Sequence, residues 1–144
     1  MQDVIAKFLS DDVKITKIKD HSTAGTDAVT SDELDMAGYD SVMFLTSFDT
    51  AAANNLITLH QSLASAGEAA SVATVASDAS STEDVVLDVL WNPAYRYAKL
   101  VATRGTSSTL ESMWAIQYNA HSKPQDNSTA GTIVTATFTC PALA

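Results

Sequence analysis

The chain has 144 residues, a formal net charge of −9 at pH 7 and a single cysteine. One domain of this length buries roughly 68–70% of its unfolded surface without disulfides or metals. The acidic balance argues against nucleic acid as a partner, and no run of residues approaches the ~20 apolar side chains of a membrane-spanning helix. The lone Cys140 excludes an intramolecular disulfide and fits synthesis in a reducing compartment.

The composition favours short β-strands joined by turns of small residues, because Ala, Ser, Thr and Val are abundant and charged and aromatic residues are few. We therefore predict an all-β fold, an antiparallel β-sandwich of about eight strands. Residues 1–12 are expected to form an N-terminal arm, and residues 13–144 a single sandwich domain. The predicted strands are Val13 to Ile18, Ser41 to Phe48, Ile57 to Leu63, Ser71 to Ala76, Val85 to Leu90, Tyr97 to Thr103, Ser112 to Asn119 and Thr132 to Thr139.

The strand predicted at Ser41 to Phe48 is apolar on both of its faces. Val42 and Phe44 point to one side, whereas Met43 and Leu45 point to the other. One side must fill the sandwich, so the other needs cover from a loop, a helix or a second subunit. Met43 and Leu45 are therefore candidate subunit contacts, with cover by the chain's own loops as the alternative.

The segment from Ala51 to Ala70 admits two interpretations. Leu56, Leu59 and Leu63 fit the three- and four-residue spacing of a helix as well as they fit a strand. From the pattern alone, helix and strand have equal support.

The strand predicted last in the chain has the clearest alternation. Val134, Ala136, Phe138 and Cys140 share one face, and threonines occupy the other, as in a half-buried antiparallel strand. Cys140 is accordingly expected to be a core residue. The pentapeptide STAGT precedes this strand and also occurs at residues 22–26, but the flanking sequences do not match, so a duplicated unit is not expected.

Charge is unevenly distributed along the chain. Twelve acidic residues and no Lys or Arg lie between Asp20 and Trp91, so every basic residue falls outside this block. If the two basic groups meet in the fold, they form a cationic patch on an anionic body; otherwise they are solvated strand faces. Alternation places Val13 and Ile15 in the core. The candidate patch residues are Lys14, Lys17, Lys19, Arg96 and Arg104.

The residue types that catalysis and metal binding require are scattered. His21, His60 and His121 lie far apart and have no cysteine beside them, so a histidine metal site is not expected. Adjacent acidic pairs point to opposite faces of an extended strand and do not form a carboxylate dyad. We therefore predict neither a catalytic site nor a metal or cofactor. The glycosylation triplet that begins at Asn127 carries little weight without an export signal.

Three segments carry a resemblance: LDMAGYDSVMFLTSF at residues 34–48, YRYAKLVATRG at residues 95–105, and WAIQY at residues 114–118. Together they resemble a family of small structural proteins of tailed bacteriophages. The resemblance covers roughly residues 13–121, and it favours strand over helix near Ile57 to Leu63. Residues 122–144 are an extension carrying the last strand, where trimer contacts or strand exchange are expected.

The resemblance implies a capsid decoration or cement protein with a jelly-roll-like sandwich. Its expected partners are the major capsid protein and two further copies of the chain in a homotrimer, with no nucleic acid and no membrane. The expected contacts with the capsid are the candidate patch residues Lys14, Lys17, Lys19, Arg96 and Arg104. The expected location is the capsid surface of the virion, after synthesis in the host cytoplasm. A head-to-tail connector or a tail component is the alternative within the same family. A virion-displayed glycan-binding module, with Trp91, Tyr95 and Tyr97 as its stacking platform, is the alternative from another class.

Overall fold

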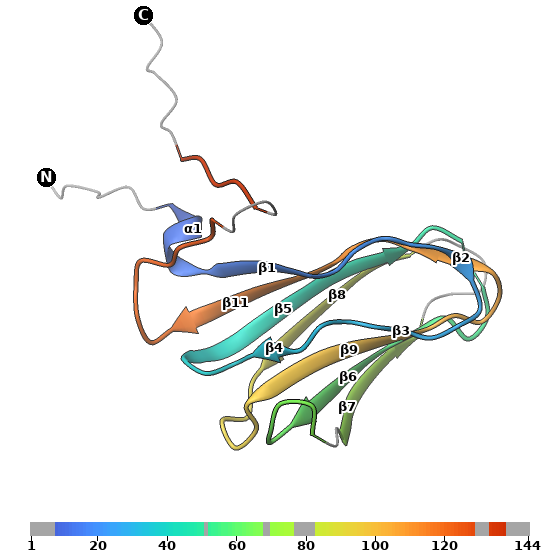
Figure 1. The fold of residues 1–144 in the computed structure, drawn as a ribbon, viewed down its shortest axis with the longest axis horizontal. Coiled ribbons are helices and arrows are strands. Elements are labelled where there is room, and N and C mark those ends of the chain that lie inside the picture. Colours follow the sequence, from blue (N-terminus) through green and yellow to red (C-terminus); the bar gives the residue numbers. More distant parts are fainter. Residues whose placement is uncertain (1–7, 51, 68–69, 77–82, 129–132, 138–144) are drawn as a thin grey trace, which may run out of the picture.

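The computed structural model describes residues 8–50, 52–67, 70–76, 83–128 and 133–137, and it forms two β-sheets packed face to face (Figure 1). Almost all of its regular structure is strand, which confirms the all-β prediction. The elements are α1 (Leu9–Asp12), β1 (Lys14–Lys19), β2 (Ser22–Gly25), β3 (Val29–Thr30), β4 (Leu34–Asp35), β5 (Tyr39–Phe48), β6 (Leu56–Ser62), β7 (Ala70–Ala76), β8 (Glu83–Leu90), β9 (Tyr97–Thr103), β10 (Ser108–Leu110) and β11 (Met113–Ala120).

The sheet order is that of a jelly roll. The first sheet runs β1-β11-β5-β10-β2 with β8 on the free side of β5, and the second runs β3-β9-β6-β7 with β4 also on β9. Because β1 continues into β2, β3 into β4, and β10 into β11, each sheet contains four long strands. The chain crosses to the other sheet after each long strand except at the β6–β7 hairpin, which is the connectivity of an eight-stranded jelly roll.

The core lies between the inner faces of the two sheets. Val42, Phe44 and Phe48 of β5 are fully buried, and they face Leu59 of β6 and Leu100 of β9 across the sandwich. Burying one such side chain contributes about 1.5–3 kcal/mol relative to leaving it exposed. The predicted alternation of β5 is confirmed, because Met43 and Leu45 are only half-buried.

Seven of the eight predicted strands are present, as β1, β5, β6, β7, β8, β9 and β11. The segment with two interpretations is a strand, because Leu56–Ser62 pairs with both β7 and β9. The remaining jelly-roll strand is formed by β3 and β4, in the acidic stretch before residue 36. Pairing with β9 holds these short strands in place, and this long-range contact is invisible in the local pattern.

The prediction of a half-buried strand at Thr132 to Thr139 is wrong for the residues that the structure describes there. Ile133 makes one isolated bridge, residues 134–137 belong to no strand, and Val134 is 96% exposed. Phe138 and Cys140 lie outside the described residues. Alternation identifies a segment that is able to form a strand. The segment forms one only where another strand is available to pair with it.

The start of β1 is held by residues from the C-terminal part of the chain. The buried Asn127 accepts a hydrogen bond from Ile15 N (2.6 Å) and donates to Val13 O (2.9 Å) and Ser10 O (2.7 Å). Val13 is buried as predicted, whereas Ile15 is only half-buried, because it points to the outer side of the first sheet. The amide of Asn127 is fully used, so the glycosylation triplet is not an accessible acceptor site.

Candidate interaction surfaces

The outer side of the first sheet is an apolar surface, which we call the apolar face. Register places Met43 of β5 between Ile116 of β11 and Asp88 of β8, and Leu45 between Trp114 and Val86. The residues of the apolar face are Ile15, Met43, Leu45, Val86, Leu90, Trp114 and Ile116. Val86 is 60% exposed and Leu90 is 83% exposed, so the face is least covered along β8.

Polar groups lie at the border of the apolar face and are paired with one another. Lys17 Nζ lies 5.9 Å from the centre of the Trp114 ring and 2.7 Å from Asp20 Oδ1. At the other border the Tyr118 hydroxyl donates to Asp88 Oδ1 (2.6 Å), and this hydrogen bond raises the pKa of Tyr118. These contacts leave the centre of the face to apolar side chains.

Two depressions occur on this side of the molecule. One of about 460 Å³ lies where α1 approaches the sheet, with Leu9, Met43 and Ile116 in its wall. The other, of about 250 Å³, lies at the opposite end, with Leu45 and Trp114 in its wall. Met43 and Leu45 therefore each line a depression that an apolar side chain of a partner could fill.

The outer side of the second sheet is more polar than the apolar face. Register pairs Thr58 of β6 with Val101 of β9, His60 with Lys99, and Thr30 of β3 with Val101. Val101 is therefore flanked on both sides by threonine. The described residues of the two outer sides therefore differ in polarity.

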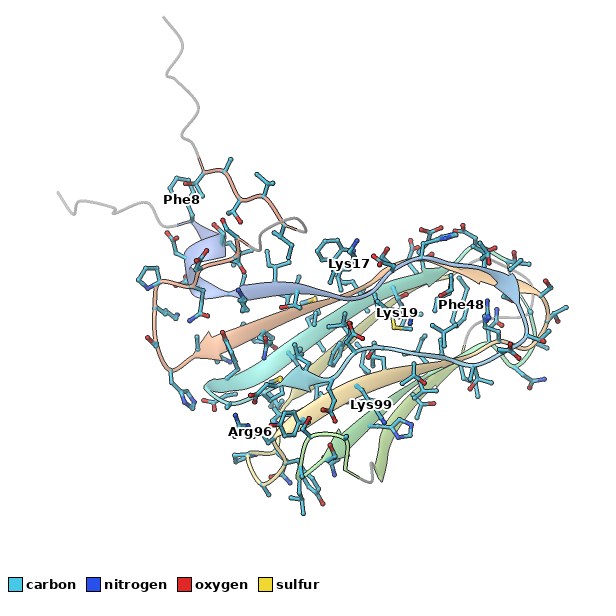
Figure 2. All side chains as sticks on the ribbon, viewed as in Figure 1. Phe8, Lys17, Lys19, Phe48, Arg96 and Lys99 are labelled. Carbon is cyan, nitrogen blue, oxygen red and sulfur yellow. The ribbon has the colours of Figure 1, made fainter. Side chains whose placement is uncertain are left out.

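The five predicted basic residues do not form one cationic patch, and Figure 2 shows Lys17 beside the first sheet and Arg96 beside the second. Lys17 lies on the outer side of the first sheet, and Lys14 Nζ donates to the carbonyl oxygen of Asp126. Arg96 and Arg104 flank β9 in the second sheet, one at each end. Lys19 lies at the end of β1, an edge strand on which lysines oppose edge-to-edge pairing. The basic residues therefore lie at separate sites on the two sheets and do not act as one charged surface.

Arg96 is part of a contact among all three segments that carry the phage resemblance. Its guanidinium donates to both carboxylate oxygens of Asp35, at 3.0 and 2.8 Å, and holds the pKa of that carboxyl below its ordinary value. Gln117 Nε2 of β11 donates to the main-chain oxygen of Asp35 (2.9 Å). Gly38, with φ of +90°, makes the turn from β4 into β5. Asp35, Arg96 and Gln117 therefore have structural roles at one end of the sandwich.

Arg104 binds the main chain rather than offering a free charge. Its side chain donates to Asp27 O (2.8 Å), to Thr23 O (2.7 Å) and to Ser108 O (3.0 Å). In the same region, Asn55 Oδ1 accepts hydrogen bonds from Gly105 N and the Ser108 hydroxyl. A contact role for Arg104 conflicts with this geometry, because the guanidinium joins three chain segments.

The aromatic residues considered for glycan stacking do not form a platform. Trp91 is only 8% exposed, belongs to the core, and donates its indole N–H to Tyr95 O (2.7 Å). Tyr95 also packs against the core, and the Tyr97 ring lies beneath Arg96, with 5.4 Å between the guanidinium carbon and the ring centre. Trp91 and Tyr95 therefore pack the fold.

The histidines lie apart in the structure. His121 Nε2 is 2.8 Å from Asp40 Oδ1, and His21 Nε2 is 4.0 Å from Glu111 Oε1. Within residues 8–50, 52–67, 70–76, 83–128 and 133–137, no three His, Cys, Asp or Glu side chains gather as metal ligands would. The helix that the structure describes is too short to cross a membrane.

Sequence reasoning identified Met43 and Leu45 but missed Val86, Leu90, Trp114 and Ile116 as members of the same face. The alternation of β8 and β11 was visible in the sequence. The missing information was the register, because only pairing with β5 shows that these side chains and Met43 point the same way.

No protein-family model and no curated protein matches the chain. Among solved structures, a chain of the Bacillus endospore appendages, a family of disulfide-linked pili, is similar with a TM-score of 0.40 and 13% identity, covering 75% of this chain and 88% of that chain. A mutant of the carbohydrate-binding module CBM29-2 in complex with cellulohexaose gives a TM-score of 0.38 and 11% identity, over 74% of this chain and 91% of that one.

Proposed function

We propose that this chain is a structural protein of a tailed-bacteriophage virion, a decoration or cement protein that binds the outer surface of the head. Its partner is the major capsid protein, and its role is to stabilise contacts between neighbouring capsid subunits. Burial at such contacts adds binding free energy to the shell without any chemical turnover.

The observation that carries the proposal is the difference between the two outer sides of the sandwich. The apolar face presents Met43, Leu45 and Trp114 together with the exposed Val86 and Leu90 of β8. An apolar area of this kind on a small protein is typical of a binding surface. The more polar side of the second sheet then faces solvent. The resemblance of residues 13–121 to small phage structural proteins supplies the class of partner.

If the protein docks through the apolar face, its affinity for the capsid should depend only weakly on salt concentration. Apolar contacts are not screened by ions, whereas an interface made by charge pairs weakens as the Debye length falls. Because the basic residues lie apart, we no longer expect a charged contact with the capsid. We expect an apolar contact instead. Arg96 and Arg104 are omitted from the proposed contact, because their guanidinium groups bind Asp35 and the main chain.

The proposal is tested by binding to heads assembled from the phage's own major capsid protein. Leu45→Glu places a charge at the centre of the apolar face, and Val101→Glu places the same charge at a half-buried strand position on the other outer side. We expect Leu45→Glu to weaken binding about tenfold or more, with Val101→Glu close to the unchanged protein. Circular dichroism checks that both variants keep the β-fold.

Each result of this experiment bears on the proposal. If both variants lose binding equally, or if neither loses binding, docking through the apolar face is contradicted. Binding that falls steeply between 50 and 500 mM salt contradicts an apolar contact. Binding to isolated tails but not to heads places the protein in the alternative role of a connector or tail component.

A further inference from the structure

The segment around Val134 has the sequence of a strand but no sheet in the monomer. Residues 134–137 are exposed and belong to no strand, and Val134 is 96% exposed. The sequence from Ile133 to Cys140 nevertheless alternates apolar residues with threonine and carries no charge, and Pro141 follows it. Alternation of this kind predicts pairing along one sheet edge, and proline is a typical residue at the end of such pairing.

The first sheet offers an edge of the same length. β8 spans eight residues, and among the strands that the structure describes it pairs only with β5, so its other side is an edge of the sheet. Among the described residues, no main-chain hydrogen bond joins β8 from Glu83 to Leu90 to a segment other than β5. Leu87 and Val89 on its inner side are only partly buried, and Val86 and Leu90 on its outer side are exposed. An added strand would cover apolar side chains on either side.

The edge at β1 and the edge formed by β3 and β4 are less suited to accept a strand. β1 is blocked at its start, where Asn127 binds Ile15 N and Val13 O, and it carries three lysines. β3 and β4 have two residues each. Lysines and short length are the devices by which edge strands avoid pairing. β8 spans eight residues and carries no lysine, although three of its residues are acidic. The β7 edge of the second sheet is seven residues long and uncharged, so length and charge do not separate it from β8. The exposed apolar side chains of Val86 and Leu90 favour β8.

The path of the chain points outward from its own sandwich. The chain passes Asn127, which is fixed at β1, and β1 and β8 are the opposite edges of the first sheet. Residues 133–137 then lead away from both sheets on the side of α1 (Figure 1). We therefore expect the strand that pairs with the β8 edge to come from another molecule.

We infer that residues 133–140 of one copy add as a strand to the free edge of β8 in a second copy. The main-chain groups of the donated strand pair with β8, and one apolar face formed by Val134, Ala136 and Phe138 packs against the apolar side chains of that edge. The donor and acceptor surfaces are different, so the contact is heterologous. Such contacts close into a ring when the rotation allows, and three copies give the trimer expected of a decoration protein. The inference does not depend on the identity of the shell.

The donor side is tested with charges on its two faces. Val134→Asp disrupts the apolar face of the segment, whereas Thr135→Asp places the same charge one residue away on the other face. We expect Val134→Asp to weaken self-association about tenfold or more in sedimentation equilibrium, and Thr135→Asp to do so much less. Both residues are exposed in the monomer, so neither change should affect folding.

The acceptor side is tested with Val86→Asp, and Leu63→Asp serves as a control at a similarly exposed apolar residue at the end of the second sheet. Only Val86→Asp should weaken association. The decisive measurement mixes two disabled proteins. Val134→Asp keeps a sound acceptor edge and Val86→Asp keeps a sound donor segment, so the mixture should form a one-to-one dimer that neither protein forms with itself.

Three results would overturn the inference. The unchanged protein could sediment as a ~15 kDa monomer at high micromolar concentration. It could be a monomer with protected amides at residues 134–137, which would mean that the segment pairs within its own chain. It could associate as before with Val134→Asp, which would mean that another surface makes the contact. None of these results bears on docking to the shell, which Leu45→Glu tests separately.

Discussion

Arg96 and Asp35 form a two-bond ion pair at the end of β4 and β9, with both guanidinium–carboxylate contacts at 3.0 Å or less. The pair joins two of the three segments that carry the phage resemblance, and Gln117 of the third segment binds the main chain of Asp35. Asp35, Arg96 and Gln117 therefore position the sandwich. The partner contact that we propose lies elsewhere, on the apolar face.

Replacing Asp35 by Asn should lower the free energy of unfolding at pH 7 by less than about 1 kcal/mol, because both side chains are about half exposed and solvent screens them. The pKa of Asp35 is lowered in the fold, so the stabilisation is present above the unfolded value and is lost as pH falls through the folded value. Urea unfolding of both proteins should therefore differ at pH 7 and converge as pH falls through the lowered pKa of folded Asp35. Arg96→Lys, which keeps the charge without the two-bond geometry, serves as the control.

Replacing Arg104 by Lys should destabilise the fold although the charge is kept. A lysine cannot reach Asp27 O, Thr23 O and Ser108 O together, and each lost hydrogen bond costs about 0.5–1.5 kcal/mol. We expect a loss of about 1–3 kcal/mol in denaturant unfolding. Lys99→Gln, which changes a residue on the outer side of the second sheet, should have little effect. If Arg104→Lys has the same free energy of unfolding as the unchanged protein, the hydrogen bonds of Arg104 do not contribute to stability.

Replacing Asn127 by Ala should free the start of β1. The change leaves Ile15 N, Val13 O and Ser10 O without their partner in a largely buried place. Unsatisfied buried groups cost about 1–3 kcal/mol each, and water entering the gap recovers part of this, so we expect a loss of about 2–4 kcal/mol. Hydrogen exchange should accelerate at Ile15. Asn127→Asp keeps the acceptor for Ile15 N and should retain protection at that amide; equal exchange in both variants would contradict the role assigned to the amide oxygen.

Replacing Glu111 by Gln should stabilise the protein at neutral pH. A hydrogen bond with Asp49 raises the pKa of Glu111 above its ordinary value of 4.5, because the protonated Glu111 carboxyl can donate to Asp49. A raised pKa means that the interaction stabilises the fold at low pH and is lost as pH rises through the folded value. The gain from Glu111→Gln should therefore appear at pH 7 and vanish below about pH 4. Asp84→Asn, which removes another exposed acid, controls for net charge; an equal gain there would assign the effect to overall repulsion.

The sequence by itself determined the fold class and most of the strands. The alternation of Val42 to Phe48 separates a core side from an outer side, and the same local rule locates β9 and β11, because side chains of a strand alternate whatever surrounds it. Local pattern also placed Met43 and Leu45 on a side that needs cover. It did not identify β3 and β4, which are too short for alternation and exist through pairing with β9.

Only the tertiary structure decided which side chains act together. Register brings Trp114 and Val86 beside Leu45, and it separates Lys17 from Arg104, which charge counting had grouped. The structure also leaves Val134 without a sheet, although its sequence is that of a good strand. The physical reason is the same in each case. Alternation is a property of neighbouring residues, whereas a surface, an ion pair or a sheet edge requires contacts between residues that are distant in the chain.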